Sequence, residues 1–257
     1  MKRKIFCRAA LLLAVILTCS VAAATAQAAA SAKQIYEWRI YYVKGDGAAV
    51  LDDHFGKTLI PAYNRQGVTV GAFKPYKEGD VEQRYLLFVY PDIASFYKVK
   101  QEIWSDFSFR EAARVFFEKT APAPVYSNFE TYLCEAFDKV PQMRTPAKDR
   151  GLFEMRVYRS PNEEANQRKI AMFNVDEIAV FDKTGINSVC YGEVLAGPKM
   201  PSLIYLTWYK DEPTRNAAWQ AFNAHPDWAR IRSLPQYANT ATDNTSVLLS
   251  PLPYSQF

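Results

Sequence analysis

The 257-residue sequence repeats itself, and this repeat limits the choice of fold more than any other feature. Residues 36–41 (Tyr-Glu-Trp-Arg-Ile-Tyr) recur 117 positions later as residues 153–158 (Phe-Glu-Met-Arg-Val-Tyr). Further pairs keep almost the same spacing: Gly67 and Gly185, Tyr90 and Tyr209, and Asp92 and Asp211. Landmarks in one order and at one spacing indicate a duplicated module. With 49% hydrophobic and 14% aromatic residues, the chain can also bury a substantial core.

Hydrophobic periodicity divides both copies into the same elements. The first copy is predicted to contain strands over 34–43, 68–76, 84–90 and 125–133, and helices over 48–65, 92–102 and 108–119. The second is predicted to contain strands over 152–158, 186–194, 202–209 and 245–250, a helix over 162–182, and helices that begin at Pro213 and Pro226. Strand, helix, hairpin, helix, strand is the ferredoxin-like order.

A ferredoxin-like module covers one face of its sheet with helices and leaves the other face to be buried. Two modules in one chain can bury these faces against each other. We therefore predict an α+β fold of two tandem ferredoxin-like (βαββαβ) modules, packed sheet to sheet as a pseudo-dimeric α/β barrel. Module 1 is predicted over 33–140, a proline-containing linker over 141–150, and module 2 over 151–257.

A segment unlike the rest precedes the first module. It has basic residues at positions 2–4 and 8, an apolar run over 9–24, and then Ala26-Gln27-Ala28. This is the order of a secretory signal peptide. We therefore predict a signal peptide over 1–28 and an exported mature protein, either periplasmic or secreted. A retained membrane anchor and a lipid attached at Cys19 are the alternatives.

The leader also accounts for the net charge of +4. Four of the 31 Lys and Arg residues belong to it, so the mature chain keeps 27 cations against 27 Asp and Glu. A neutral chain lacks the positive field that attracts phosphate backbones and anionic lipids. We expect neither a nucleic-acid partner nor a membrane partner after the signal peptide is cleaved.

The repeated strand suggests a ligand site. Since side chains alternate along a strand, we expect Tyr36, Trp38 and Ile40 to face the helices. The polar set would then face the barrel interior and bind a small molecule between the two sheets: Glu37, Arg39, Tyr41, Glu154, Arg156 and Tyr158. An arginine beside a glutamate can form a two-pronged ion pair and leave the tyrosine hydroxyl free for a ligand. The alternative is a closed ion-pair network that specifies how the sheets meet.

Other chemistry-bearing residues give weaker signals. We expect His54 to lie at the surface or at the boundary of the core, and His225 to lie at a helix start. Two histidines, one in each module, do not form a metal-ligand cluster, so we predict no metal or cofactor, and no catalytic residue is assigned. Cys134 and Cys190 are expected to be buried free thiols, although an exported protein could also pair them in a disulfide.

The sequence resembles the NIPSNAP family over nearly all of residues 33–257. The resemblance rests on the two opening strands, on Gly67-Val68 and Gly185-Ile186, on the helix 217–222 and on His225-Pro226-Asp227-Trp228. It implies a dimeric α/β-barrel fold, shared with small monooxygenases, dehydratases and heme-containing relatives, and roles in binding or protein interaction without a settled chemistry. The first copy departs from the pattern, because Ser95-Phe96-Tyr97 stands in its second helix and the His-Pro-Asp-Trp turn is missing. The two halves need not work alike.

Two functions follow from these features. The first is a small-molecule-binding or protein-interaction module, for which a homodimer is also open. The second is a cofactor-independent enzyme, of the monooxygenase or isomerase type, acting on a small aromatic or carbonyl substrate through Tyr41, Tyr158 or His54. A cavity of at least about 300 Å³ beside the arginines would favour a ligand, and a filled interior would favour an interaction role.

Overall fold

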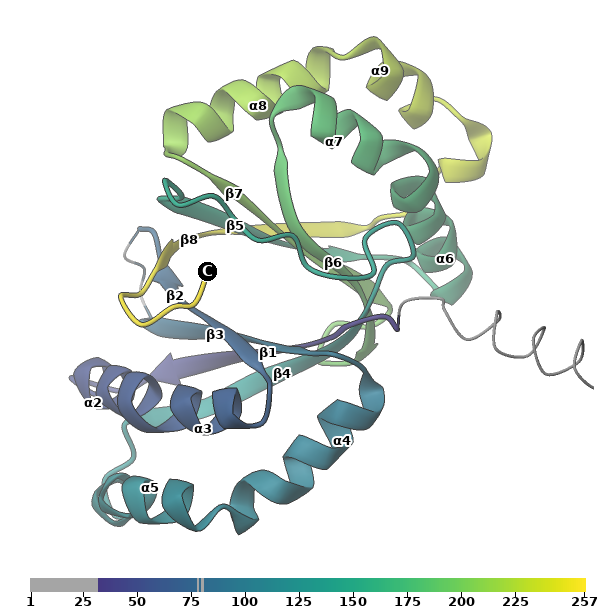
Figure 1. Ribbon diagram of the computed structural model, residues 1–257. Coiled ribbons are helices and arrows are strands. Elements are labelled where there is room, and N and C mark those ends of the chain that lie inside the picture. Colours follow the sequence, from purple (N-terminus) through teal and green to yellow (C-terminus); the bar gives the residue numbers. More distant parts are fainter. Residues whose placement is uncertain (1–31, 78, 80) are drawn as a thin grey trace, which may run out of the picture. The chain divides into compact units, whose positions relative to one another are not determined.

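The computed structural model describes residues 32–77, 79 and 81–257, so the predicted signal peptide and Cys19 lie outside the described residues. Residues 33–257 form one compact unit built around a closed barrel (Figure 1). The first module supplies β1 (Ile35–Val43), β2 (Thr69–Pro75), β3 (Gln83–Tyr90) and β4 (Tyr126–Ala136). The second supplies β5 (Leu152–Arg159), β6 (Asn187–Ala196), β7 (Ser202–Tyr209) and β8 (Asp243–Pro251).

The strand order confirms the predicted pseudo-dimeric α/β barrel. Around the barrel it runs β1-β3-β2-β8-β5-β7-β6-β4, so each module contributes a four-stranded sheet of ferredoxin-like order. The two sheets are also hydrogen-bonded at both edges, where β2 pairs with β8 and β4 pairs with β6, all antiparallel. Closure of this kind leaves no open sheet face between the modules. One chain therefore builds the whole barrel.

Each module carries its helices on the outside of its own sheet (Figure 1). The first has α2 (Ala48–His54), a π-helical turn η2 (Phe55–Leu59), α3 (Ile60–Arg65), α4 (Ile93–Glu102), the 3₁₀ turn η3 (Ile103–Ser105) and α5 (Phe107–Thr120). The second has α6 (Glu163–Met172), η4 (Phe173–Glu177), α7 (Ile178–Thr184), α8 (Glu212–Ala224), α9 (Pro226–Arg232) and the 3₁₀ turn η5 (Pro235–Tyr237). The predicted helices are therefore present, and a π turn interrupts the long first helix at the same place in both modules.

The recurring landmarks mark helix ends. Asp92 accepts a hydrogen bond from the backbone N–H of Ser95, and Asp211 does the same for Thr214, so each carboxylate caps the second helix of its module. Gly67 and Gly185 follow the first helices with φ of 77° and 80°, a left-handed conformation that favours glycine. These positions repeat because both modules need the same backbone geometry there.

The core forms three layers, and their content corrects one prediction. The barrel interior is filled by apolar side chains of both modules, among them Tyr36, Trp38, Ile40, Phe153 and Met155. The two other clusters lie between each sheet and its helices. Trp38 and its alternating neighbours therefore point into the barrel, and the polar set of the same strand points out beneath the helices. The predicted facing is wrong because both faces of β1 are buried, so alternation does not tell which face is inside.

Cys134 and Cys190 are buried and free, as predicted. Both belong to the barrel interior. Burial raises the pKa of the Cys190 thiol to about 12 and also raises the pKa of the Cys134 thiol well above its ordinary value, so neither is a reactive thiolate at neutral pH. Within the described part of the chain, no helix has the length and apolar character needed to cross a bilayer.

Candidate ligand-binding site

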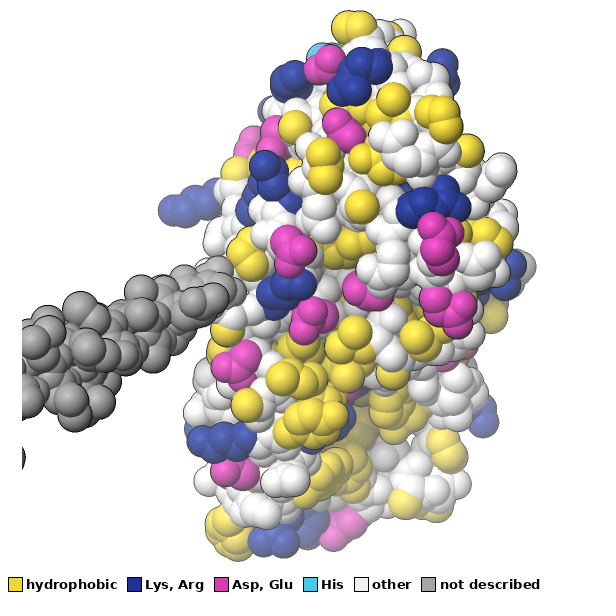
Figure 2. Space-filling model, turned by 90° about the vertical axis from the view of Figure 1, so that its right-hand side faces the viewer, with side chains coloured by type: hydrophobic (Ala, Val, Ile, Leu, Met, Phe, Trp, Pro, Cys, Tyr) yellow, Lys and Arg dark blue, Asp and Glu magenta, His cyan; other side chains and the backbone are white. Residues whose placement is uncertain are grey.

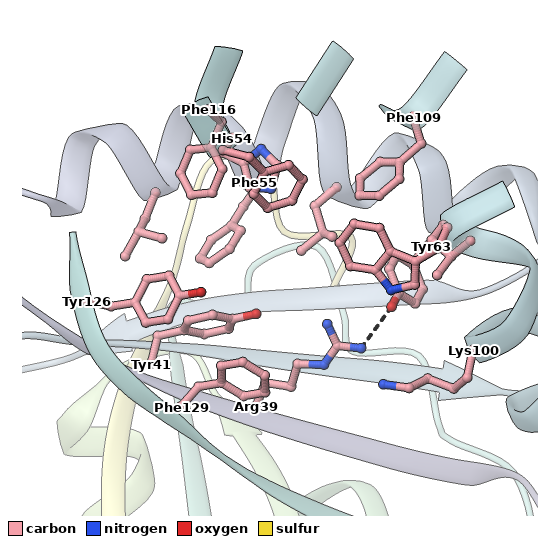
Figure 3. Close-up of a pocket in the computed structure, with 15 residues that line it drawn as sticks. Arg39, Tyr41, His54, Phe55, Tyr63, Lys100, Phe109, Phe116, Tyr126 and Phe129 are labelled. Atoms are coloured by element: carbon pink, nitrogen blue, oxygen red, sulfur yellow. Dashed lines mark hydrogen bonds between the residues drawn. The ribbon is translucent and has the colours of Figure 1, made fainter. Parts of the chain in front are cut away.

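The first module contains a cavity of about 290 Å³ between the outer face of its sheet and its helices (Figure 3). Residues from β1, the long first helix, α4 and its 3₁₀ turn, and α5 converge on it, including Arg39, Tyr41, His54, Tyr63, Lys100 and Trp104. Most of the remaining wall is phenylalanine and leucine. The cavity is thus an aromatic chamber with a few polar groups at its base, a common composition for small-molecule sites.

A buried carboxylate organises the base of this cavity. Glu37 is 1% exposed and accepts Arg39 through Nε at 2.8 Å and Nη2 at 3.1 Å. Tyr90 donates its hydroxyl to the same carboxylate at 2.6 Å, and Lys100 donates its ammonium at 3.2 Å. Burial alone would raise the pKa of Glu37, but Arg39 and the other donors hold that pKa below its ordinary value. One ionised carboxylate therefore faces two cations.

Arg39 presents its unused side to the cavity. Its Nη2 also donates to the Tyr63 hydroxyl at 2.8 Å, and its guanidinium lies 4.2 Å from the ring centre of Phe88. On its remaining side Arg39 has no carboxylate or carbonyl acceptor among the described residues, and it lies close enough to the Tyr41 phenol to oppose the rise that burial gives the pKa of Tyr41. The hydroxyls of Tyr41 and Tyr126 point toward the same space (Figure 3). A cation, with two phenols nearby, is thus held where an oxygen of a ligand could accept its hydrogen bonds.

His54 lies in the cavity wall rather than at the surface or boundary, which corrects the prediction for this residue. It is 7% exposed, and its imidazole stacks on the Phe116 ring at 3.8 Å between centres. Its Nδ1 is buried and has no hydrogen-bond partner in the described structure. Burial lowers the pKa of His54 to about 4, so the ring is neutral at physiological pH.

The surface around this module is unusually apolar. Exposed large side chains include Tyr97, Trp104, Phe107, Val115, Phe117 and Phe129. Figure 2 shows hydrophobic side chains gathered around a hollow on the lower part of one face, the side of the first module. Sequence reasoning missed this contribution, although the aromatic density of residues 103–117 is visible in the sequence. The ligand-binding set predicted from the sequence contains strand residues alone.

The buried carboxylate of the second module accepts more hydrogen bonds than that of the first. Glu154 is fully buried and accepts Arg156 at 2.7 Å, Arg215 at 2.7 and 2.9 Å, the Trp219 indole N–H at 2.8 Å, and the Ser246 hydroxyl at 2.6 Å. Burial opposes ionisation, but these donors lower the pKa of Glu154 to about 2. The indole of Trp219 also lies over the guanidinium of Arg156, 4.5 Å from the ring centre. The indole therefore covers one face of the second arginine, while that arginine still lines a cavity of its own.

Comparison with known protein families shows which family the chain matches. The family model described as NIPSNAP matches residues 36–121 and 153–256, one match in each module. The chain belongs to the NIPSNAP family. No protein of the curated collection matches it. The duplicated barrel of this NIPSNAP protein therefore contains two family domains in tandem.

Solved structures share the fold of this NIPSNAP protein. A candidate monooxygenase from Fusobacterium nucleatum is 12% identical with a TM-score of 0.55, covering 86% of this chain and 93% of its own. A candidate monooxygenase from Lactobacillus acidophilus is 9% identical with a TM-score of 0.57, over 85% and 94%. An anthrone oxidase-like protein is 9% identical with a TM-score of 0.51, over 87% and 93%. At these identities the similarity shows the fold alone.

The structure separates the six predicted site residues of this NIPSNAP protein into two groups. Glu37, Arg39 and Tyr41 lie beneath the helices of the first module, and Glu154, Arg156 and Tyr158 lie beneath those of the second. They do not meet between the sheets, because that space is filled by the interior cluster. A single central site is therefore wrong, and the binding role of each group remains a prediction. Among the described residues, no three His, Cys, Asp or Glu side chains are placed to hold a metal ion.

Proposed function

We propose that the first module binds a small planar aromatic molecule that carries a carbonyl or an ionised oxygen. The observation that carries this proposal is the position of Arg39, a buried guanidinium that faces an aromatic cavity and has the phenol of Tyr41, not a second carboxylate, on its remaining side. An ionised oxygen of a ligand would be a stronger acceptor for this cation than a phenol is.

The size and the charge of the cavity limit the class of ligand that it can bind. A cavity of about 290 Å³ lies at the lower end of small-molecule sites, so it suits one or two fused rings. The local charge is positive, since Arg39 and Lys100 together face the single carboxylate of Glu37. Rings of Phe55, Phe109 and Phe116 supply flat apolar walls. An aromatic carboxylate or phenolate satisfies all three conditions.

Copying one residue from the second module tests the proposal. Lys100→Trp would place an indole over Arg39, as Trp219 covers Arg156, and its N–H could still donate to Glu37. We expect the variant to fold and to bind 1-hydroxy-2-naphthoate at least about tenfold more weakly than the parent, because the indole fills the cavity. Binding is measured by calorimetric titration of the mature chain.

Lys98→Trp is the matched control, because Lys98 is exposed on the same helix and does not line the cavity. It should bind the naphthoate like the parent. Naphthalene, which lacks an oxygen, should bind more weakly than the naphthoate to both proteins. Equal affinity of Lys100→Trp and the parent, or no saturable naphthoate binding by the parent, would contradict the proposal.

A cofactor-independent enzyme is the second candidate, favoured by one observation. The unpartnered Nδ1 of His54 lies in the cavity wall, where it could accept a proton from a bound acid. A pKa of about 4 makes it a weak base at neutral pH, so binding is the stronger proposal. His54→Met copies the second module, where Met172 occupies the equivalent position. Turnover of the naphthoate that disappears in His54→Met while binding persists would establish the enzyme.

We propose further that the mature protein works outside the cytoplasm, on the strength of the signal-peptide pattern over residues 1–28. Cell fractionation of the full chain, beside a chain that begins at residue 29 after an initiator methionine, tests this. The full chain should be found shortened in the exported fraction, and the shorter chain should remain in the cytoplasm. Recovery of both in the cytoplasm would refute export.

A further inference from the structure

We propose that the second module holds a second binding site, of a different specificity, for a small hydroxylated carboxylate such as a sugar acid. The site is a cavity of about 350 Å³ beneath the helices of the second module, and it is separate from the first cavity. Its distinctive lining residues are Arg156, Lys169, Glu177, Trp219, Asn223 and Asn244. This inference is independent of the function proposed for the first module.

Equivalent positions in the two long helices carry opposite chemistry. The π turn begins at Phe55 in the first module and at Phe173 in the second, which fixes the register between the two helices. In that register Leu51 corresponds to Lys169, and Leu59 corresponds to Glu177. All four side chains are buried and line their own cavities. Two leucines in one module are thus an ion pair in the other.

Two further positions change in the same direction. Counted from the capping residues Asp92 and Asp211, Trp104 corresponds to Asn223. In the strand register, Tyr41 pairs with Phe129, and its counterpart Tyr158 pairs with Asn244. Both asparagines line the second cavity, and both aromatic counterparts line the first. Four apolar lining positions of the first cavity are therefore polar in the second, while Lys100 of the first is replaced by Trp219, so the two cavities suit different ligands.

Packing alone does not explain the ion pair. Lys169 Nζ lies 3.0 Å from Glu177 Oε2, and the two side chains are 8% and 3% exposed. Desolvation of a buried pair commonly offsets its Coulomb attraction, so apolar residues of similar size often serve stability equally well. The first module shows that the same helix packs with leucines at both places. The Lys169 ammonium also lies near the rings of Tyr158, Phe173 and Trp228, and contact with a polar ligand would give the ion pair a role beyond packing.

The lining groups define the ligand class. Arg156 uses Nη1 for Glu154 and Nε for Tyr158, and its Nη2 has no acceptor among the described residues, so it can receive a carboxylate. The Lys169 and Glu177 pair and the two asparagine amides offer both donors and acceptors, which suit hydroxyl groups. A purely aromatic ligand could not use these donors and acceptors. A carboxylate with several hydroxyls pairs with all of them.

The test replaces polar residues that line the second cavity with the apolar residues found at the same positions in the first. Lys169→Leu/Glu177→Leu copies the first module, keeps the net charge and removes the polar base of the site. Calorimetric titrations of the mature chain use D-glucuronate, D-gluconate and L-malate, with D-glucose and benzoate as controls that lack the carboxylate or the hydroxyls. The parent should bind at least one hydroxylated carboxylate more tightly than both controls. The double variant should lose at least about tenfold of that affinity while remaining folded.

Asn244→Phe supplies a second variant at an exposed position, where folding is not at risk. It copies Phe129 and should also weaken binding by about tenfold. Lys100→Trp, which fills only the first cavity, should leave binding of the hydroxylated carboxylate unchanged. The proposal is overturned if the parent binds none of the three acids, if both second-module variants bind like the parent, or if Lys100→Trp abolishes the binding.

Discussion

The two modules share one backbone plan, and they differ at a residue of the second helix that faces the buried carboxylate. In the first module this residue is Lys100, which donates to Glu37 and leaves Arg39 open to a cavity. In the second it is Trp219, which donates to Glu154 and covers Arg156. Both preserve the hydrogen bond to the carboxylate. The residue at this position therefore decides whether an indole or an ammonium lies beside the Glu-Arg pair of the opening strand.

The comparison shows what a duplication within one chain allows. A symmetric homodimer of single modules would carry every substitution twice, once in each subunit. Here the two copies vary separately, so one can have an apolar cavity while the other has a polar one. The barrel itself constrains both copies equally, because the interior cluster draws side chains from each.

The largest expected effect is on stability, and it should differ between the buried carboxylates of the two modules. Glu37→Gln should lower the free energy of unfolding by about 3–5 kcal/mol, because it leaves the guanidinium of Arg39 buried without its counter-ion. Glu154→Gln should cost less, since Arg156 and Arg215 keep 17% and 22% of their side-chain exposure and can be partly rehydrated. Denaturant unfolding of both variants measures the order. A larger loss of stability for Glu154→Gln would show that the number of hydrogen-bond donors to the carboxylate matters more than how deeply the paired arginine is buried.

Lowering the pH should reduce the stability of the first module, because His54 is buried in its neutral form. Its pKa is about 4 in the folded protein against an ordinary 6.5, so the unfolded chain binds the proton first as the pH falls. Stability from this residue is complete above pH 6.5 and is lost between about pH 6.5 and 4, to a total of up to about 3 kcal/mol. Unfolding of the parent and of His54→Met across this range measures the difference. Parallel pH profiles of the two proteins would mean that the imidazole is not buried in solution.

Much of the fold could be predicted from the sequence, because backbone requirements leave local signals. The glycines that end the first helices and the aspartates that cap the second helices stand at the same spacing in both copies. The alternating strands and the periodic helices follow from the same local rules. Spacing between landmarks therefore predicted the element order and the barrel.

The site was predicted only in part. Glu37 and Arg39 were correctly singled out as neighbours, and the structure pairs them. Their facing was wrong, because a strand buried on both faces carries no sign of which face is the interior. Lys100 and Trp219 were missed because their relation to the carboxylates comes from helix packing across more than 60 residues of sequence. No local pattern encodes such a contact.

Removing the ion pair of the second module should stabilise the protein. Lys169→Leu/Glu177→Leu replaces two buried charges with the residues that the first module uses, and such replacements are neutral or stabilising by about 1–4 kcal/mol. We expect about 2 kcal/mol, because the pair has few other polar partners. Denaturant unfolding measures this gain in stability. The single variant Lys169→Leu leaves the buried Glu177 without its counter-ion and should instead be less stable than the parent. Destabilisation of the double variant would mean that the pair contributes net stability.

The smallest expected effect concerns the tyrosine that steadies Arg39. Tyr63 accepts a hydrogen bond from Arg39 Nη2 at 2.8 Å, and the equivalent residue of the second module is Phe181, which cannot accept one. Tyr63→Phe should therefore cost about 1.5 kcal/mol, the usual contribution of a hydrogen bond to a charged group. The same change should free Nη2 and weaken naphthoate binding only slightly, since Nη1 still faces the cavity. An unchanged stability would indicate that Glu37 holds the guanidinium without help from Tyr63.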